Sequence, residues 1–164
     1  MSIDDDLSRI ALQEKELQFD SFSLETGWAL GSLLYDTAKR RQLGVVIDIT
    51  LFSMPVFYAA LEGATPDNPQ WVRRKRNCVL RFFKSSYATG LALAKQETNL
   101  QAKFGLPDTD YAPHGGSFPI NVKGTGCIGA VTVSGLPQRT DHDMVVEALA
   151  NILGKDLATL KLAD

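Results

Sequence analysis

The sequence predicts a mixed α+β fold, in which helices cover a mostly antiparallel sheet. Apolar residues recur at helical spacing in two long segments, 24–42 and 69–96. Residues 45–51 alternate instead with the period of two that marks a strand. The predicted strands form two pairs whose connections are too short for a parallel crossover. The resulting order is two helices, two strands, a long helical region, two strands and a helix, which is typical of a layered α+β domain.

Composition favours a single globular domain spanning residues 1–164. Hydrophobic residues make up 45% of the chain and charged residues 22%, which excludes the fibrous, disordered and disulfide-rich classes. A chain of this length buries roughly 70% of its unfolded surface on folding, so it needs no disulfide or structural metal. The formal net charge of −2 argues against nucleic acid as a partner, because phosphate binding requires a basic surface.

The amino-terminal residues and the cysteines favour a cytoplasmic protein. Residues 1–6 are acidic where a secretory signal is basic, and no apolar run is long enough to cross a bilayer. Cys78 and Cys127 match no Cys-x-x-Cys spacing, so we expect two small core residues in a reducing compartment. No membrane partner is expected.

The first half of the chain is predicted to hold two helices and a hairpin. Residues 4–18 carry acids in the first turn, where the helix dipole favours them. The helix over 24–42 ends with cations and a following glycine, which are stop signals. Strands are predicted over 45–51 and 56–61, and the preceding Pro55 suits the start or edge of a strand.

The long helical region follows a loop over residues 63–69 that is rich in glycine, proline, aspartate and asparagine. Asn68 is the expected N-cap, and the proline after it suits the first helical position. The helical pattern is interrupted near Ser85-Ser86 or at Gly90. We therefore expect one long helix or two consecutive ones.

The last third of the chain predicts a second hairpin, with strands over 118–122 and 127–134, and a final helix. Thr140-x-x-Asp143 resembles a capping box that would open this helix. Residues 124–129 (GTGCIG) satisfy the G-x-G-x-x-G dinucleotide fingerprint. That fingerprint requires a strand that turns into a helix, whereas here a strand follows, so the glycines are better explained by a hairpin turn.

The sharpest charge asymmetry lies between residues 73 and 84, which hold six cationic residues and no acidic one. Four of the six fall outside the apolar arc of the helical wheel, where a solvated face is the simpler interpretation. The alternative is a surface that docks an acidic partner protein. These four residues are Arg73, Arg74, Arg81 and Lys84.

Lys75 and Arg76 differ from the other cations because their positions fall inside the apolar arc of the wheel. A buried cation requires a partner, which could be a carboxylate of this chain, a carboxylate of a neighbouring subunit or an anionic ligand. The other interpretation is that both side chains extend along the surface to reach solvent. Asp48, alone among apolar neighbours on its strand, is the candidate partner for either cation.

The most site-like stretch by residue type is 111–116, in a loop that leads into a strand. Two glycines allow backbone amides to approach a ligand closely, and the imidazole of His114 can donate, accept or coordinate. The candidate ligand-binding residues are Tyr111, His114, Gly115, Gly116 and Ser117, together with Lys75 and Arg76.

Catalytic and metal signatures are absent from the sequence. His142 lies between two aspartates near a helix start, and we expect it at the surface or in a cap. The two histidines have none of the spacings typical of a metal site. Because no nucleophile signature is present either, the sequence leaves it open whether the protein is an enzyme.

Five ordered motifs extend over most of the chain, from about residue 12 to residue 153. They are Thr65-Pro66-Asp67-Asn68, Trp71-Val72-Arg73-Arg74-Lys75-Arg76-Asn77, Ser85-Ser86-Tyr87, His114-Gly115-Gly116-Ser117-Phe118-Pro119-Ile120, and residues 129–137 followed by Asp141-His142. Together they resemble a cytoplasmic branch of the GlcG/HbpS-like superfamily of haem-degrading domains.

This resemblance implies a profilin-like fold, with a five-stranded antiparallel sheet, helices on both faces and residues 17–22 as the fifth strand. It also implies a homodimer or a larger ring of dimers, and a link to haem, for whose binding and degradation relatives are named. We therefore expect an oligomeric small-ligand-binding protein that takes haem or another small anion. The alternative is a non-catalytic interaction module that docks an acidic partner through its basic helix.

Overall fold

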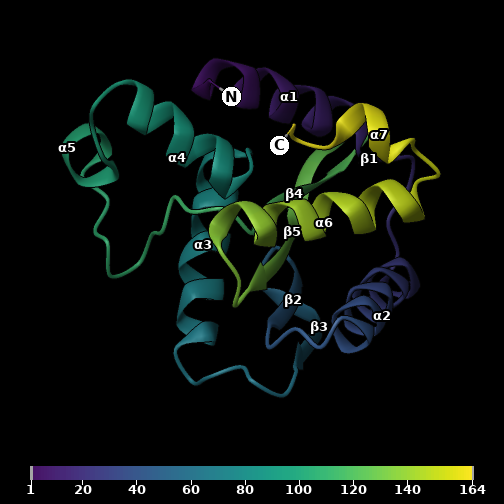
Figure 1. Ribbon diagram of the computed structural model, residues 1–164. Helices are drawn as coiled ribbons and strands as arrows, with labels where there is room; N and C mark the ends of the chain where they lie inside the picture. The colour runs from purple at the N-terminus through teal and green to yellow at the C-terminus, as the bar shows by residue number, and fades with distance from the viewer. Residues whose placement is uncertain (1, 164) are drawn as a thin grey trace.

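The computed structural model describes residues 2–163, which form one five-stranded sheet with helices on both faces (Figure 1). The strands are β1 (Gln18–Phe19), β2 (Val46–Leu51), β3 (Met54–Ala60), β4 (Ser117–Val122) and β5 (Gly126–Ser134). The helices are α1 (Ile3–Glu16), α2 (Leu24–Arg40), α3 (Asn68–Phe82), α4 (Ser86–Lys95), α5 (Leu100–Phe104), α6 (Gln138–Ile152) and α7 (Leu157–Leu160). The predicted α+β layered fold is confirmed.

The sheet has the strand order β1-β4-β5-β2-β3. Strands β2, β3, β4 and β5 pair antiparallel, as the short hairpin connections predict. The fifth strand forms within the expected segment, but β1 pairs parallel with β4, so the expectation of a wholly antiparallel sheet is wrong at this edge. The long segment between β1 and β4, which holds the β2–β3 hairpin and helices α2 to α5, permits this direction, because a parallel neighbour needs an extended crossover.

The two faces of the sheet have different chemistry. Helices α2 and α6 contact each other and the sheet, and they bury the main apolar core with Ile47, Ile49, Val131 and Val133. Helix α3 lies against β2, β4 and β5 (Figure 1). Because side chains alternate along a strand, the residues between those core positions point to the opposite face, which is the α3 side.

The helix boundaries confirm one prediction and correct another. Phe83 adopts the left-handed conformation at the end of α3, and the Ser85 hydroxyl caps α4 by accepting a hydrogen bond from the Ala88 amide at 3.1 Å. The break near Ser85 is therefore confirmed. The capping box Thr140-x-x-Asp143 is wrong, because α6 begins at Gln138 and Thr140 lies inside the helix.

The placement of His142 is also corrected. Its side chain is completely buried between the rings of Tyr87 and Phe118, not at the surface or in a cap. The Nε2 atom lies 2.8 Å from Gln13 Oε1, which links α6 to α1. Burial lowers the pKa of His142 from the usual 6.5 to about 3, so the folded protein holds a neutral imidazole.

This buried imidazole predicts a loss of stability in acid. Between pH 6.5 and 3 the unfolded chain binds a proton at His142 that the folded chain excludes, so the free energy of unfolding falls as the pH falls. The expected contribution is up to about 1.4 kcal/mol per pH unit. The measurement is urea unfolding at a series of pH values for the wild type and His142→Gln. Equal pH dependence in both proteins would contradict the prediction.

Two further expectations concern the cysteines and the helices. Cys78 is buried and Cys127 half-buried, and both are free thiols, as predicted. Within residues 2–163 no helix combines the length and the apolar character needed to cross a membrane.

Candidate functional site

The α3 side of the sheet carries a layer of buried polar side chains. Asp48 on β2 lies directly opposite Thr132 on β5, and Thr132 lies opposite Ser117 on β4. The Ser117 and Thr132 hydroxyls bond to each other at 2.8 Å, and the Thr50 hydroxyl donates to Asp48 at 2.8 Å. This layer explains why α3 places two cations inside its apolar arc: the surface beneath that part of the helix is polar.

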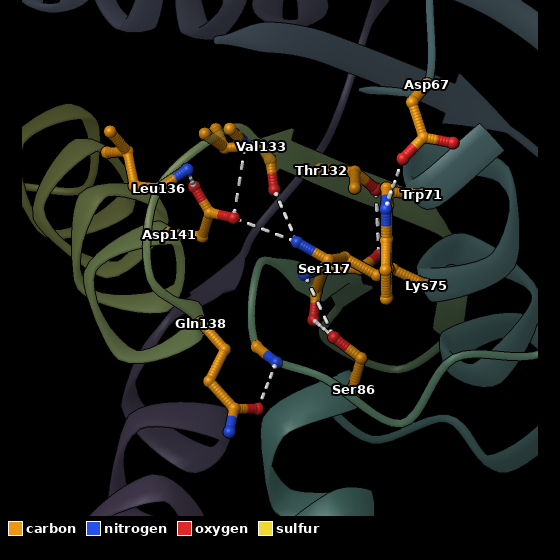
Figure 2. A network of polar contacts seen from close by, with 12 residues as sticks. Asp67, Trp71, Lys75, Ser86, Ser117, Thr132, Val133, Leu136, Gln138 and Asp141 are labelled. Carbon is orange, nitrogen blue, oxygen red and sulfur yellow. Dashed lines mark hydrogen bonds and ion pairs between the residues drawn. The ribbon is translucent and has the colours of Figure 1, made fainter. Parts of the chain in front are cut away.

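Lys75 reaches from α3 to the first turn of α6, where it forms a buried ion pair with Asp141 (Figure 2). The Lys75 Nζ to Asp141 Oδ2 distance is 2.9 Å, and the two side chains are only 4% and 1% exposed. Nζ also donates to the Val133 carbonyl at 3.4 Å. Asp141 accepts hydrogen bonds from the amides of Leu136 and Gly135, which hold its carboxylate in place.

Burial shifts both groups of this pair toward their neutral forms. The pKa of Lys75 is lowered because desolvation disfavours the ammonium, and the nearby Asp141 only partly offsets this effect. The pKa of Asp141 is raised by desolvation, against the opposing influence of Lys75 and the two backbone amides. Both shifts reflect the cost of burying a charge, which the ion pair only partly offsets.

Arg76 occupies a separate position on the same helix. Its guanidinium donates to Asp48 at 2.9 Å and lies 3.5 Å from the Thr50 hydroxyl. The side chain is 22% exposed, whereas Asp48 is nearly buried. The sequence left three kinds of partner open for Lys75 and Arg76, and both cations pair with carboxylates of this chain. Asp48, the candidate for either cation, pairs with Arg76 and not with Lys75.

A hollow of about 350 Å³ lies beside the Lys75–Asp141 pair. His114 lines this hollow and is partly exposed to solvent. Its ring lies edge-on to the Trp71 indole, at a centroid distance of 5.5 Å. The indole is fixed by a 2.9 Å hydrogen bond to Asp67 (Figure 2) and by the Arg74 guanidinium above its ring. The lining residues are Asn68, Trp71, Lys75, His114, Ser134, Gly135, Leu136, Gln138 and Asp141.

A second hollow, of about 460 Å³, shares His114 and Gln138 with the first. Tyr111 and Arg74 line it, together with apolar side chains of α4 and α5 that include Leu91. Partial burial lowers the pKa of His114, an effect that a hydrogen bond with Gln138 partly offsets. The imidazole between the two hollows is therefore neutral near pH 7, which leaves a ring nitrogen able to accept a proton or bind a metal.

The two glycines after His114 are needed by the packing of the chain itself. A Cβ atom on Gly115 would lie 2.1 Å from the Gln138 carbonyl oxygen. Gly116 has a φ of +129°, and a Cβ there would lie 2.3 Å from the Val133 oxygen and 2.8 Å from Lys75 Nζ. Gly115 thus lets the loop pack against the start of α6, and Gly116 lets the backbone approach Lys75.

The structure brings together only part of the predicted site. Lys75 and His114 line the first hollow, and Tyr111 lines the second. Ser117 is fully buried, and its amide donates a hydrogen bond to the Ser86 hydroxyl at 3.1 Å. It therefore anchors the end of the loop and is not available to a ligand. Arg76 lines neither hollow. The sequence reasoning missed Trp71, Gln138 and Asp141 as site residues, although the first and last lie within the quoted family motifs.

The basic face of α3 is partly used within the chain. Arg73 pairs with Asp110 at 3.0 Å and donates to the Thr109 carbonyl at 2.7 Å. Arg74 donates to the Asp108 carbonyl at 2.7 Å. These two arginines therefore hold the loop that leads to His114.

Among the described residues, no group of three or more acidic, histidine or cysteine side chains is placed to hold a metal ion.

The comparison with protein families agrees with this architecture. Residues 22–150 match the model of the family described as haem degrading protein HbpS-like. The chain belongs to this family. A relative in Rhizobium meliloti (strain 1021), the UPF0303 protein R02983, is 72% identical over 162 residues, which cover 99% of each chain.

Solved structures show the same fold. The crystal structure of the Ybr137w protein has a TM-score of 0.83 and 29% identity, over 90% of this chain and 87% of that one. The structure of a PduOC:heme complex has a TM-score of 0.68 and 16% identity, over 79% of this chain and 94% of that one. At that identity the second likeness shows the fold alone.

Proposed function

We propose that the protein binds a small anionic ligand at His114, with haem as the first ligand to test. The observation that carries this proposal is the position of a neutral imidazole between two hollows, each of which contains a cationic side chain. Lys75 lines one hollow and Arg74 lines the other. Family membership and the fold shared with a haem complex support the choice of haem.

The residues around His114 fit the chemistry of haem. A neutral imidazole is a common axial ligand of haem iron, and the partial burial of His114 keeps it neutral. The second hollow offers apolar side chains for the macrocycle, and Arg74 supplies a cation for a propionate. When bound, haem would supply redox and oxygen chemistry that no side chain of this site provides.

A haem titration followed by visible absorbance tests the proposal. Wild-type protein should bind haem saturably, and His114→Ala should bind at least about tenfold more weakly, because it loses the iron ligand. Arg81→Ala is the matched control: this cation lies on the same helix, exposed and outside both hollows, and its loss should leave the affinity unchanged. Equal affinity of His114→Ala and the wild type would exclude His114 as the ligand.

Docking of an acidic partner through the basic helix is the weaker candidate function. Two of its four cations, Arg73 and Arg74, already hold the loop over residues 107–112. Of these four cations, only Arg81 and Lys84 are exposed and take no part in holding that loop. A surface interaction of this kind would weaken steeply as ionic strength rises, whereas binding in a hollow would change less.

The proposal includes self-association, as a homodimer or a larger ring of dimers. Three large apolar side chains, each at least 50% exposed, lie close together where α2 meets the edge strand β3. Exposed apolar patches and unpaired strand edges are typical of interfaces. Because an isologous interface repeats the same patch on both copies, a second copy of this chain suits this surface. The three residues are Leu24, Trp28 and Met54.

Light scattering tests this interface. The wild type should show at least twice the monomer mass of 17.9 kDa, and Trp28→Arg should shift it toward the monomer, because the new charge would be buried without a partner. Phe83→Arg is the control, since Phe83 is equally exposed but lies at the end of α3. A wild-type mass near 17.9 kDa would contradict self-association.

A further inference from the structure

Lys75 is unusual among the lysines because its amine is buried and still borders a hollow. The side chain is 4% exposed, and it lines the 350 Å³ hollow together with its partner Asp141. The sequence has nine lysines, and others among them, such as Lys39 and Lys84, are exposed surface cations. A structural ion pair needs no adjoining hollow, so this placement calls for an explanation in terms of a ligand.

We propose that Lys75 is a reactive amine that forms an imine with a small aldehyde or ketone bound in this hollow. The proposal rests on the hollow of the proposed function being open to ligands, but not on haem being the ligand. The volume is near the lower end of the range for ligand pockets, which favours a small carbonyl compound.

The surroundings of Nζ suit a nucleophilic amine. Two acceptors of the described residues, Asp141 Oδ2 and the Val133 carbonyl, occupy two of the three donor positions of the ammonium, and the second contact is long at 3.4 Å. Gly116 packs directly against Nζ, because a Cβ there would lie only 2.8 Å from it, so the glycine permits the close approach of the backbone to the amine. Burial also lowers the pKa of Lys75, which increases the fraction of free amine at neutral pH.

Asp141 can handle the proton that imine formation requires. It first takes a proton from the Lys75 ammonium. The free amine then attacks the carbonyl carbon as the carbon–oxygen π bond breaks, and a proton passes from the new ammonium nitrogen to the alkoxide oxygen to give a neutral carbinolamine. The carboxylic acid returns the proton to the carbinolamine hydroxyl, which leaves as water while the carbon–nitrogen double bond forms. The product is a protonated imine paired with the Asp141 carboxylate, so atoms and charge balance without any further reagent.

The Leu136 and Gly135 amides make Asp141 a positioned group for this role. Both donate to its carboxylate, so the oxygen that faces Nζ stays within 2.9 Å of it. An aspartate free to rotate would lose this alignment. The same contacts favour the charged carboxylate, so the resting protein holds an ion pair from which a proton moves when a carbonyl compound enters.

Trapping with acetaldehyde and cyanoborohydride tests the proposal on the full-length protein at pH 7.5. Peptide mass spectrometry gives the alkylation rate of each lysine. We expect Lys75 to be alkylated faster than Lys39 and Lys84, because its lowered pKa raises the fraction of free amine. This difference should disappear in denaturant, where all lysines are equally hydrated.

The pH profile separates a reactive amine from a structural one. The alkylation rate of Lys75 should reach its plateau at a lower pH than the rate of Lys84 in the same sample. Alkylation of Lys75 at or below the rate of the exposed lysines would overturn the proposal. Haem binding is measured separately, so trapping at Lys75 without haem binding would remove haem and keep the imine, and the reverse would remove the imine alone.

Discussion

Replacing Asp141 with alanine is expected to lower the free energy of unfolding by about 3–5 kcal/mol, which is the cost of leaving one member of a buried ion pair alone. Lys75 would remain 96% buried without its carboxylate partner, and the amides of Leu136 and Gly135 would lose their acceptor. Urea unfolding at pH 7 measures the effect. Because Asp141 also fixes the start of α6, the loss should lie in the upper part of that range.

A double-mutant cycle isolates the pair from the rest of the site. Lys75→Met should destabilise the protein strongly by itself, but should cost much less when Asp141→Ala is already present, since no unpaired charge remains. Glu147→Ala, which breaks the half-exposed pair with Arg41, is the matched control and should cost less than about 1 kcal/mol. Additive losses for Lys75 and Asp141 would show that the two side chains do not interact in solution.

Gly116→Ala is expected to be the second severe substitution, with a loss of roughly 3 kcal/mol or more in the free energy of unfolding. The backbone there has a φ of +129°, which an L side chain rarely adopts. The added methyl group would also meet the Val133 carbonyl oxygen at 2.3 Å and Lys75 Nζ at 2.8 Å. The methyl group must therefore displace Lys75 or the adjacent strand.

Gly124→Ala provides the control for backbone strain alone. Gly124 also has a positive φ, of +80°, but nothing lies within 4 Å of the position its Cβ would take. Its substitution should therefore cost only about 1–2 kcal/mol. If the two variants lost equal stability, the close approach of Gly116 to Lys75 would not matter energetically.

The strands and the polar layer show what local sequence can predict. The period of two over β2 identified the strand, and it also placed Asp48 on a face away from Ile47 and Ile49. The wheel of α3 correctly identified two cations that need partners. These predictions succeeded because they depend on residues within one helix or strand.

The remainder of the site depends on contacts between distant segments. Lys75 and Asp141 are 66 residues apart, so no local pattern paired them. For His142, the sequence contained a pattern that indicates burial, but a second feature favoured the surface. His142 precedes the buried Val145 and Leu149 by three and seven residues, which is the spacing of one helix face, but its two aspartate neighbours suggested the surface.

The most direct test of the ligand site is backbone amide NMR of the full-length protein during a haem titration. Paramagnetic broadening falls steeply with distance from the iron, so it locates the ligand. We predict that the strongest broadening affects His114 and Gln138, which line both hollows, and the adjacent Gly115 and Gly116. Broadening centred on Trp28 and β3, or spread evenly over the chain, would contradict a ligand site at His114.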